Sequence, residues 1–338
     1  MTSTPQVPYV SVFALVAGHL YLPHKEIFQD VLENGLETGG EVVPTFSFMI
    51  EHPTRGKYLF DLGLRKHAEG YPPALNDTLS EFKPQCDKNV AEILRENHID
   101  PNEIRGIILL IGLIYSTSML MQSHLHFDHT GDVQPFHSAE IIVGSEAKVL
   151  FDQPVYPTDP DSPFNEWPEG RSVRYLEFKE TLPFESHSKS LPSYFKKTND
   201  FFGDGSFLLI DAPGHFPGHL AALARVTGSI GPSEVEVSSS PNLETYILLA
   251  GDCCHDRQCY TVVPPNLDIR QISEANHDDI EEARATVASL IHVVKEFPNV
   301  VIMLAHEKEY QEEGMPFLPD SLNHWVVDRV RTRLTGII

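Results

Sequence analysis

The sequence predicts a mixed α+β fold. Residues 42–51 alternate in hydrophobicity and are rich in β-prone residues, and several shorter segments share this pattern. Residues 279–296 instead place apolar side chains at helical spacing, which predicts an amphipathic helix. No repeat of roughly 20–50 residues and no linker between two cores is visible, so residues 1–338 are expected to form a single domain.

The first third of the chain is predicted to be mostly β-structure. Residues 53–56 form a turn between the two arms of a hairpin, and the second arm runs directly into Asp61 and Gly63. The expected strands are 9–17, 42–51, 57–61 and 104–109, and the expected helix is 87–97.

The rest of the chain predicts further strands and the main helices. Ser145 is the expected N-cap of a helix over residues 145–150. Residues 152–200 are rich in Pro, Asp, Ser and aromatic residues, which predicts a long irregular loop of the kind that forms lids or binding surfaces. The expected strands are 140–143, 207–211, 220–226, 245–249 and 300–304, and the further helices are 279–296 and 322–334.

The charge of the chain argues against polyanionic partners. It has 25 Lys and Arg and 48 Asp and Glu residues, so its formal net charge is −23. A field of this sign repels nucleic acid and anionic membrane surfaces, and neither is expected as a partner. A small-molecule substrate is expected instead, and the sequence leaves the oligomeric state open.

Cysteine content and the N-terminus favour a cytoplasmic location. The chain has 4 cysteines and no CxxC pair, which is too little for a disulfide framework or a structural zinc site. The first residues lack the basic region of a signal peptide. The apolar stretch 110–122 is interrupted by Gly112 and Tyr115 and is shorter than the roughly 20 apolar residues of a membrane helix.

Residues 123–131, with the sequence SHLHFDHTG, concentrate metal-binding side chains. In an extended segment His124, His126 and Asp128 point to one side, because side chains two positions apart do so, and His129 points elsewhere. Imidazole and carboxylate are usual zinc ligands, and this division suits two ions better than one. The alternative is a solvated polar loop, but 17 histidines among 338 residues make such a group rare by chance.

Other predicted strands also end in His or Asp. Asp61, Asp252 and His306 follow hydrophobic strands, and His215 follows the turn after residue 211. Side chains at strand ends can be held rigidly around one cleft.

Together these motifs resemble the metallo-β-lactamase superfamily in its dinuclear hydrolase form, and their order matches from Tyr9 to His306. Residues 123–132 and 213–219 are most similar to the N-acyl-homoserine lactonases, with glyoxalase II as a more distant relative.

The resemblance implies an αββα sandwich, in which helices cover two packed β-sheets, and two Zn²⁺ ions per chain. Asp61 is implied to support the metal loop without binding metal, and His219 is expected to orient its loop through a hydrogen bond. Asp252 is implied to bridge the ions. The other implied ligands are His124, His126 and His215 for one ion, and Asp128, His129 and His306 for the other.

The sequence departs from the superfamily in two places. The strand 104–109 would run directly into Ser123 if residues 110–122 were absent, so these 13 residues interrupt the junction. We interpret them as a true insertion or as an unspliced fragment of the gene; a cDNA that carries them and encodes a soluble, zinc-loaded protein would exclude the fragment. Second, the lactonases carry a tyrosine three residues after the bridging Asp, where this chain has His255. An imidazole could donate a hydrogen bond to a developing oxyanion there.

The resemblance implies an enzyme, a metal-dependent hydrolase. A hydroxide bridging the ions would attack the carbonyl of a lactone or similar cyclic ester, and Asp128 or Asp252 would pass a proton to the leaving group. The loop 156–167, with Phe164 and Trp167, is expected to shape an apolar pocket. Lactam and thioester hydrolases use the same ligands, so a glyoxalase II-like activity stays open, as does a catalytically silent metal-binding protein. The charge disfavours a nucleic-acid phosphodiesterase, and His126 disfavours a flavodiiron protein.

Overall fold

The structure is built on two six-stranded β-sheets. The computed structural model describes residues 8–35, 39–110, 127–180, 194–227, 244–265 and 267–335. In spatial order the first sheet contains β1 (Ser11–Pro23), β2 (Gly40–His52), β3 (Gly56–Phe60), β4 (Ile104–Ile108), β5 (Glu140–Gly144) and β6 (Val173–Leu176). The second contains β12 (Val300–Leu304), β11 (Tyr246–Gly251), β10 (Leu220–Arg225), β9 (Phe207–Asp211), β8 (Lys197–Asp200) and β7 (Lys179–Glu180).

Both sheets mix parallel and antiparallel pairs. In the first sheet β1, β2 and β3 are antiparallel neighbours, while β3 to β6 pair in parallel. In the second sheet β11 and β12 are parallel, and the remaining pairs are antiparallel. Because the carboxyl ends of parallel neighbours lie at the same sheet edge, β3 with β4 and β11 with β12 deliver the residues that follow them to shared edges.

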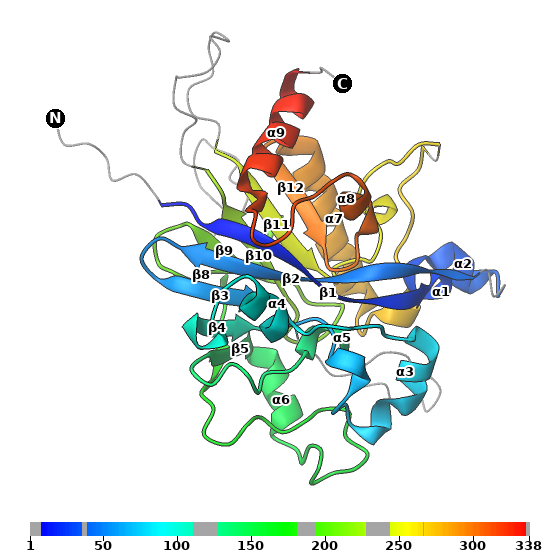
Figure 1. Ribbon diagram of the computed structural model, residues 1–338. Coiled ribbons are helices and arrows are strands. Elements are labelled where there is room, and N and C mark those ends of the chain that lie inside the picture. The colour runs from blue at the N-terminus through cyan, green and yellow to red at the C-terminus, as the bar shows by residue number, and fades with distance from the viewer. Residues whose placement is uncertain are drawn as a thin grey trace.

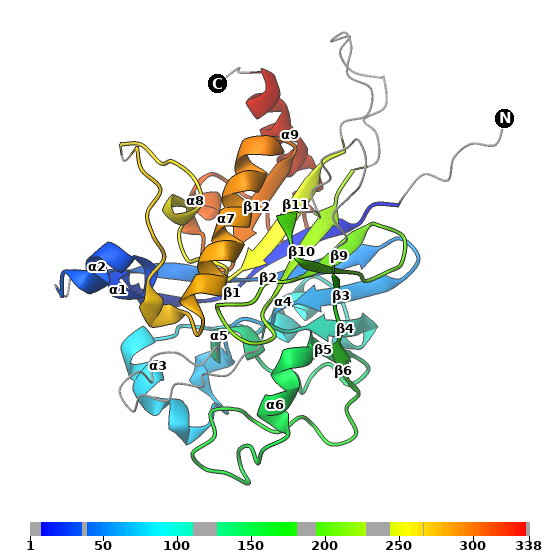
Figure 2. The same ribbon diagram turned by 180° about the vertical axis from the view of Figure 1, so that it is seen from behind.

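Helices cover the outer faces of the two sheets (Figures 1 and 2). On the first sheet α4 (Val90–Glu96) packs Val90 and Leu94 against the strands, and α6 (Lys148–Phe151) lies beyond β5. On the second sheet α7 (Ile280–Glu296) buries Val287 and Leu290 against β11 and β12. These four layers form the αββα sandwich that the resemblance implied, so that prediction is confirmed.

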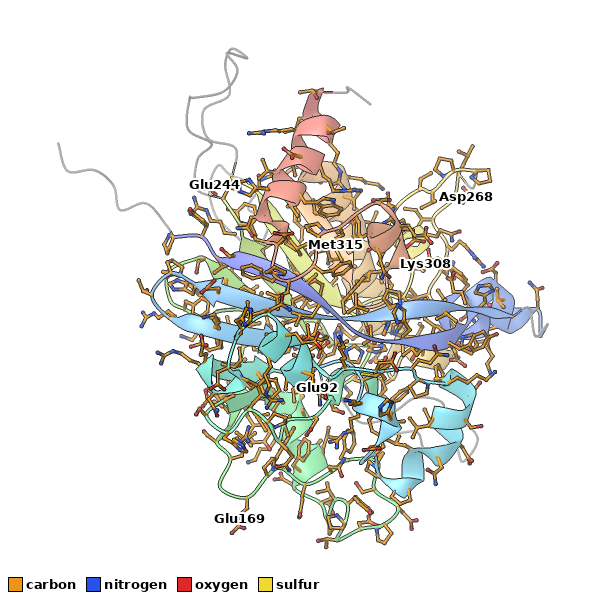
Figure 3. The ribbon with its side chains drawn as sticks, in the orientation of Figure 1. Glu92, Glu169, Glu244, Asp268, Lys308 and Met315 are labelled. Atoms are coloured by element: carbon orange, nitrogen blue, oxygen red, sulfur yellow. The ribbon has the colours of Figure 1, made fainter. Side chains whose placement is uncertain are left out.

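An apolar core fills the space between the sheets. Phe46 and Phe60 of the first sheet meet Leu249 and Met303 of the second. The helix α9 (Leu322–Thr335) closes this core at one end, and Met315, on the segment that leads into α9, is buried beneath it (Figure 3). The remaining α-helices are short: α1 (His24–Ile27), α2 (Gln29–Glu33), α3 (Asn76–Phe82), α5 (Phe127–Thr130) and α8 (Lys308–Glu312).

Most of the predicted strands and helices are confirmed, and two predictions are wrong. Ser145 does not cap a helix, because Gly144 occupies the N-cap position. Ser145 is the first residue of a short 3₁₀ turn that leads into α6. Residues 152–200 are not wholly irregular, because β6, β7 and β8 lie within them and pair at the sheet edges. Of the interrupting segment 110–122, only Leu110 is among the described residues. Within the described part of the chain, every helix is too short or too polar to cross a membrane.

Candidate metal centre

Asp252 lies at the centre of a group of buried imidazoles. It directly follows β11, and its Oδ2 is 2.8 Å from Nε2 of His129, 3.4 Å from Nε2 of His215 and 3.5 Å from Nε2 of His255. Its Oδ1 is 3.6 Å from Nε2 of His306. One carboxylate is therefore shared by ring nitrogens that come from four separate positions in the sequence.

These side chains form two groups that could each hold a metal ion. Asp252 belongs to both; the first group adds Asp128, His129 and His306, and the second adds His215 and His255. In a tetrahedral zinc site with bonds of about 2.0–2.1 Å, the ligand atoms lie about 3.3 Å from one another. The separations around Asp252 are close to this value, and Oδ2 of Asp128 is 3.1 Å from Nε2 of His306. The donor set therefore fits zinc in both its chemistry and its spacing.

The ring orientations also suit metal binding. A histidine that binds metal through Nε2 carries its hydrogen on Nδ1 and donates it to a fixed partner. Nδ1 of His129 is 2.6 Å from Oδ2 of Asp61, and Nδ1 of His306 is 2.9 Å from the carbonyl oxygen of Pro44. Nδ1 of His215 is 3.2 Å from Nδ1 of His277. In all three rings Nε2 is left facing Asp252.

The end of β3 fixes the position of His129. Asp61 follows β3 in a left-handed conformation with φ of 67°, which turns its carboxylate toward α5. One oxygen contacts His129, and the other accepts a hydrogen bond from the backbone N–H of Leu110. Asp61 thus supports a candidate ligand from behind, the role that the resemblance implied.

The loop 213–219 brings His215 to the same place. Gly214 has φ of 108°, and a Cβ there would lie 2.0 Å from the backbone nitrogen of Ala283, so only glycine lets the loop approach α7 this closely. His219 donates from Nδ1 to the carbonyl of Ala212 and accepts at Nε2 from the backbone N–H of Asp252. This hydrogen bonding is the orienting role expected for His219.

The buried charges of the cluster shift one another's pKa values. Burial would lower the pKa of His306, but Asp252 and Asp128 raise it to about 10. Burial also opposes charge on His129, but its neighbouring carboxylates, Asp252 first, raise its pKa well above the usual range. Burial lowers the pKa of His215 to about 4. Burial would raise the pKa of Asp252, but His129, His306 and His255 hold it well below its ordinary value.

The structure assembles most, but not all, of the predicted site. Asp128, His129, His215, Asp252, His255 and His306 are brought together and buried. His124 and His126 lie outside the described residues. Sequence reasoning missed His277, which contacts His215, and Asn276, whose Nδ2 lies 3.1 Å from Nε2 of His255. Neither belongs to a recognisable motif, so no signal in the sequence marked them.

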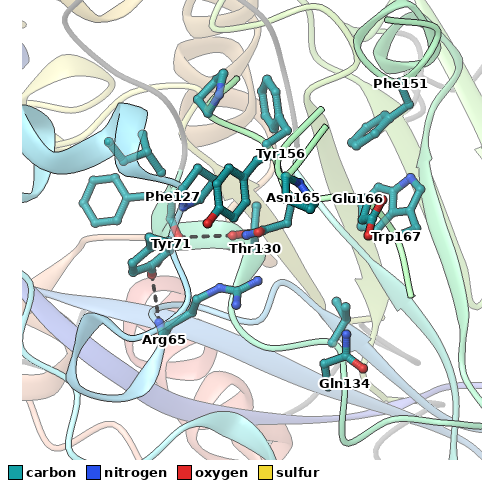
Figure 4. A pocket seen from close by; sticks show the side chains of 16 residues that line it. Arg65, Tyr71, Phe127, Thr130, Gln134, Phe151, Tyr156, Asn165, Glu166 and Trp167 are labelled. Carbon is teal, nitrogen blue, oxygen red and sulfur yellow. Dashed lines mark hydrogen bonds between the residues drawn. The ribbon is translucent and has the colours of Figure 1, made fainter. Parts of the chain in front are cut away.

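A cavity of about 230 Å³ lies on the other side of α5. Phe127 and Thr130 of α5 line it, whereas Asp128 and His129 of the same helix belong to the metal-binding group. Tyr71 holds this wall of the cavity together, because its hydroxyl donates to the carbonyl of Phe127 and accepts from the backbone N–H of Arg65. Figure 4 shows Phe151 and Trp167 across the cavity from Tyr71 and Phe127.

The far wall of this cavity comes from the predicted loop. Phe164 and Trp167 both line it, and Trp167 packs on Phe151 with ring centroids 4.6 Å apart. The chain then turns outward to Glu169, which is exposed at the periphery of the molecule (Figure 3).

Comparison with known proteins first gives relatives much longer than this chain. No protein-family model matches it. It is 31% identical over 306 residues to the cytochrome P450 monooxygenase mpaDE of Penicillium roqueforti, which is 83% of this chain but 32% of that protein. The chain thus spans about a third of the length of the first curated relatives it matches. Since most of mpaDE has no counterpart here, its name does not assign an activity to this chain.

Two further comparisons identify the family. The γ-lactamase MBL2 of Gibberella moniliformis is 35% identical over 202 residues, which are 58% of this chain and 70% of the relative. A crystal structure of a B. thuringiensis AiiA mutant with N-decanoyl-L-homoserine at its active site matches the fold with a TM-score of 0.56 at 19% identity, over 93% of this chain and 99% of that chain. With the ligand motifs and the αββα sandwich, these matches show that the chain belongs to the metallo-β-lactamase superfamily.

Proposed function

We propose that the chain is a metal-dependent hydrolase that opens a lactone or similar cyclic ester with two zinc ions. The observation that carries the proposal is the place of Asp252, which is common to both groups of candidate ligands. A shared carboxylate suits two ions roughly 3.5–4 Å apart that act on one substrate group. The acyl-homoserine in the AiiA structure supports a lactone as the substrate class.

The proposed ligands follow the superfamily. Asp252 would contact both ions, with Asp128, His129 and His306 at one of them. His215 would hold the other ion together with His124 and His126. When bound, the ions would supply Lewis acidity and lower the pKa of water to about 7.

Asp128 is the proposed proton carrier. Burial would raise its pKa, but His129 and His306 lower it, so the carboxylate is ionised at neutral pH. It is also the most exposed carboxylate of the cluster, with 12% of its side chain accessible, compared with 4% for Asp252. A carboxylate in this state can first accept a proton and then donate it to the leaving oxygen or nitrogen.

A lactam is the second candidate substrate, because a relative that is 35% identical, and of which this chain covers 70%, is named a γ-lactamase. Esters and amides share the attacked carbonyl and differ in the leaving atom. Activity on matched lactones, lactams and thioesters, measured on the zinc-loaded chain, would rank the three classes. A chain that binds less than about one ion and hydrolyses none of them would favour the catalytically silent alternative.

Removing the aromatic wall of the cavity is expected to weaken binding of large substrates. Phe164→Ala and Trp167→Ala should raise KM for substrates with a long acyl chain or a ring, by about 10-fold for each lost side chain, since each removes roughly 1–3 kcal/mol of apolar contact. The KM of small substrates and kcat should change little. Trp325→Ala is the matched control, because Trp325 packs on Tyr310 away from the cavity. An unchanged KM in both cavity variants would contradict a binding role for this wall.

Zinc binding is expected to release protons. The neighbouring carboxylates raise the pKa of both His129 and His306, which favours protonated rings in the metal-free chain at neutral pH, and a ligand histidine must be neutral. Saturation with zinc should therefore release about two protons per chain from these rings, and affinity should fall as pH falls from about 10. Calorimetry in buffers of different ionisation enthalpy measures this number. His306→Gln should reduce it by about one, and a release near zero in the unmodified chain would contradict both assignments.

A further inference from the structure

We infer that His255 is itself a metal ligand, so that His215, Asp252 and His255 hold one of the two ions. The inference rests on the proposed metal-dependent function, and it changes the role of His255 from a substrate contact to a part of the metal site. Neither the sequence motifs nor the relatives assign this role to the residue.

The spacing of the three side chains carries the inference. Oδ2 of Asp252 lies 3.4 Å from Nε2 of His215 and 3.5 Å from Nε2 of His255, and the ligand atoms of all three lie within 4.8 Å of one another. Both distances are close to the separation of about 3.3 Å between neighbouring ligand atoms in tetrahedral zinc sites. An ion placed between the three atoms would meet two imidazoles and one carboxylate, all buried.

The hydrogen bonding of His255 places an electron pair on Nε2, the ring nitrogen nearest Asp252. Nδ2 of Asn276 lies 3.1 Å from this nitrogen, and an amide –NH₂ group can only donate. In the tautomer that matches this contact, Nε2 accepts and the ring hydrogen is on Nδ1. A nitrogen in this state can bind a cation in exchange for the amide, but it cannot donate a hydrogen bond to an oxyanion.

The ring of His255 is also held in place before any ion arrives. It is 5% exposed and lies nearly parallel to the ring of His306, with centroids 6.0 Å apart and an interplanar angle of 11°. Its centroid is 5.2 Å from that of His215. A ligand that is already fixed by its neighbours loses little conformational freedom when metal binds.

This ligand set does not depend on residues 110–126. His215 comes from the loop after β9, and Asp252 and His255 come from the turn after β11. An ion could therefore bind here whatever the placement of His124 and His126. Three protein ligands would leave a fourth position open for water or substrate, as in catalytic zinc sites.

The test compares metal binding in the full chain and in two variants, His255→Phe and His255→Gln. The metal-stripped proteins are titrated with Zn²⁺ against a chelator and with Co²⁺, whose visible spectrum reports the ligands of the ion. Both variants are expected to bind one ion at least about 10–100-fold more weakly and to show a changed Co²⁺ spectrum. His52→Phe is the matched control, because His52 is a buried imidazole on β2 that contacts Asp204 outside the cluster. Circular dichroism checks that each variant is folded. If His255→Phe does not fold, the comparison uses His255→Gln alone.

The outcomes separate this inference from the proposed function. Unchanged affinity and an unchanged Co²⁺ spectrum in the folded variants would overturn the role of His255 as a ligand, even if activity fell. If the unmodified chain binds no ion at all, both the proposed metal-dependent function and the role of His255 as a ligand are refuted. Loss of one ion in the variants, with the second ion retained, supports the inference.

Discussion

Replacing Asp252 by Asn is expected to lower hydrolysis by at least about 10³-fold, the size seen when one essential group of a catalytic site is removed. The substitution keeps the shape of the side chain but removes the negative charge that faces Nε2 of His129, His215, His255 and His306. Because this carboxylate belongs to both ligand groups, both ions should bind more weakly.

The measurement is kcat/KM together with the metal content of the purified protein. Asp256→Asn is the matched control: Asp256 is a buried carboxylate four residues further on, but it caps a turn through the backbone N–H of Gln258. The control should keep both ions and most of the activity. Full metal content and activity in Asp252→Asn would refute a bridging role.

Deleting residues 110–122, so that Ser123 follows Leu109, is expected to raise hydrolysis by at least about 10²-fold, since small displacements of catalytic groups cost about this much. In the full chain Leu110 donates its backbone N–H to Asp61, and its side chain is buried beside Gly251. In the shortened chain Ser123 would take this position. His124 and His126 would then lie directly between the end of β4 and the start of α5.

Metal analysis distinguishes this effect from a general gain in folding. The shortened chain should bind the ion at His215 more tightly than the full chain does, because His124 and His126 would join its ligands. Deleting 13 residues, 229–241, from the Gly-, Ser- and Pro-rich loop before β11 is a control of equal length. If the 110–122 deletion leaves activity and metal affinity unchanged, the segment does not interrupt the site.

The sequence predicted the parts of the fold that depend on hydrophobic pattern. The strands β2 and β9 and the helix α7 lie within two residues of their predicted ends, because each buries a regular apolar face. The strand β8, with the sequence KTND, could not be found this way. Its place comes from backbone pairing with β9 and with the edge strand β7, and not from burial of its side chains. Helices of only four residues, such as α1 and α5, could not be found either. A helix this short is not stable by itself and forms only because tertiary packing holds it.

The candidate ligands were predictable because they follow strands that the pattern identifies. Asp252 directly follows β11, His306 follows β12 after Ala305, and parallel pairing of the two strands places them together. His277 lies in an irregular segment that tertiary contacts bring to the cluster. The backbone N–H groups of Asp278 and Asp279 donate to the carbonyl oxygens of His215 and Gly214. These bonds place His277 beside His215. No local property of the sequence encodes that contact.

The charge balance around Asp252 bears on when the protein would acquire its metal. In the metal-free chain the protons on His129 and His306 offset two of the three negative charges of Asp61, Asp128 and Asp252. Most of the charge in the cluster can therefore be balanced during folding without zinc. Loading then becomes an exchange of protons for ions in a preformed receptor, and a chain made under zinc starvation should remain competent to be activated later.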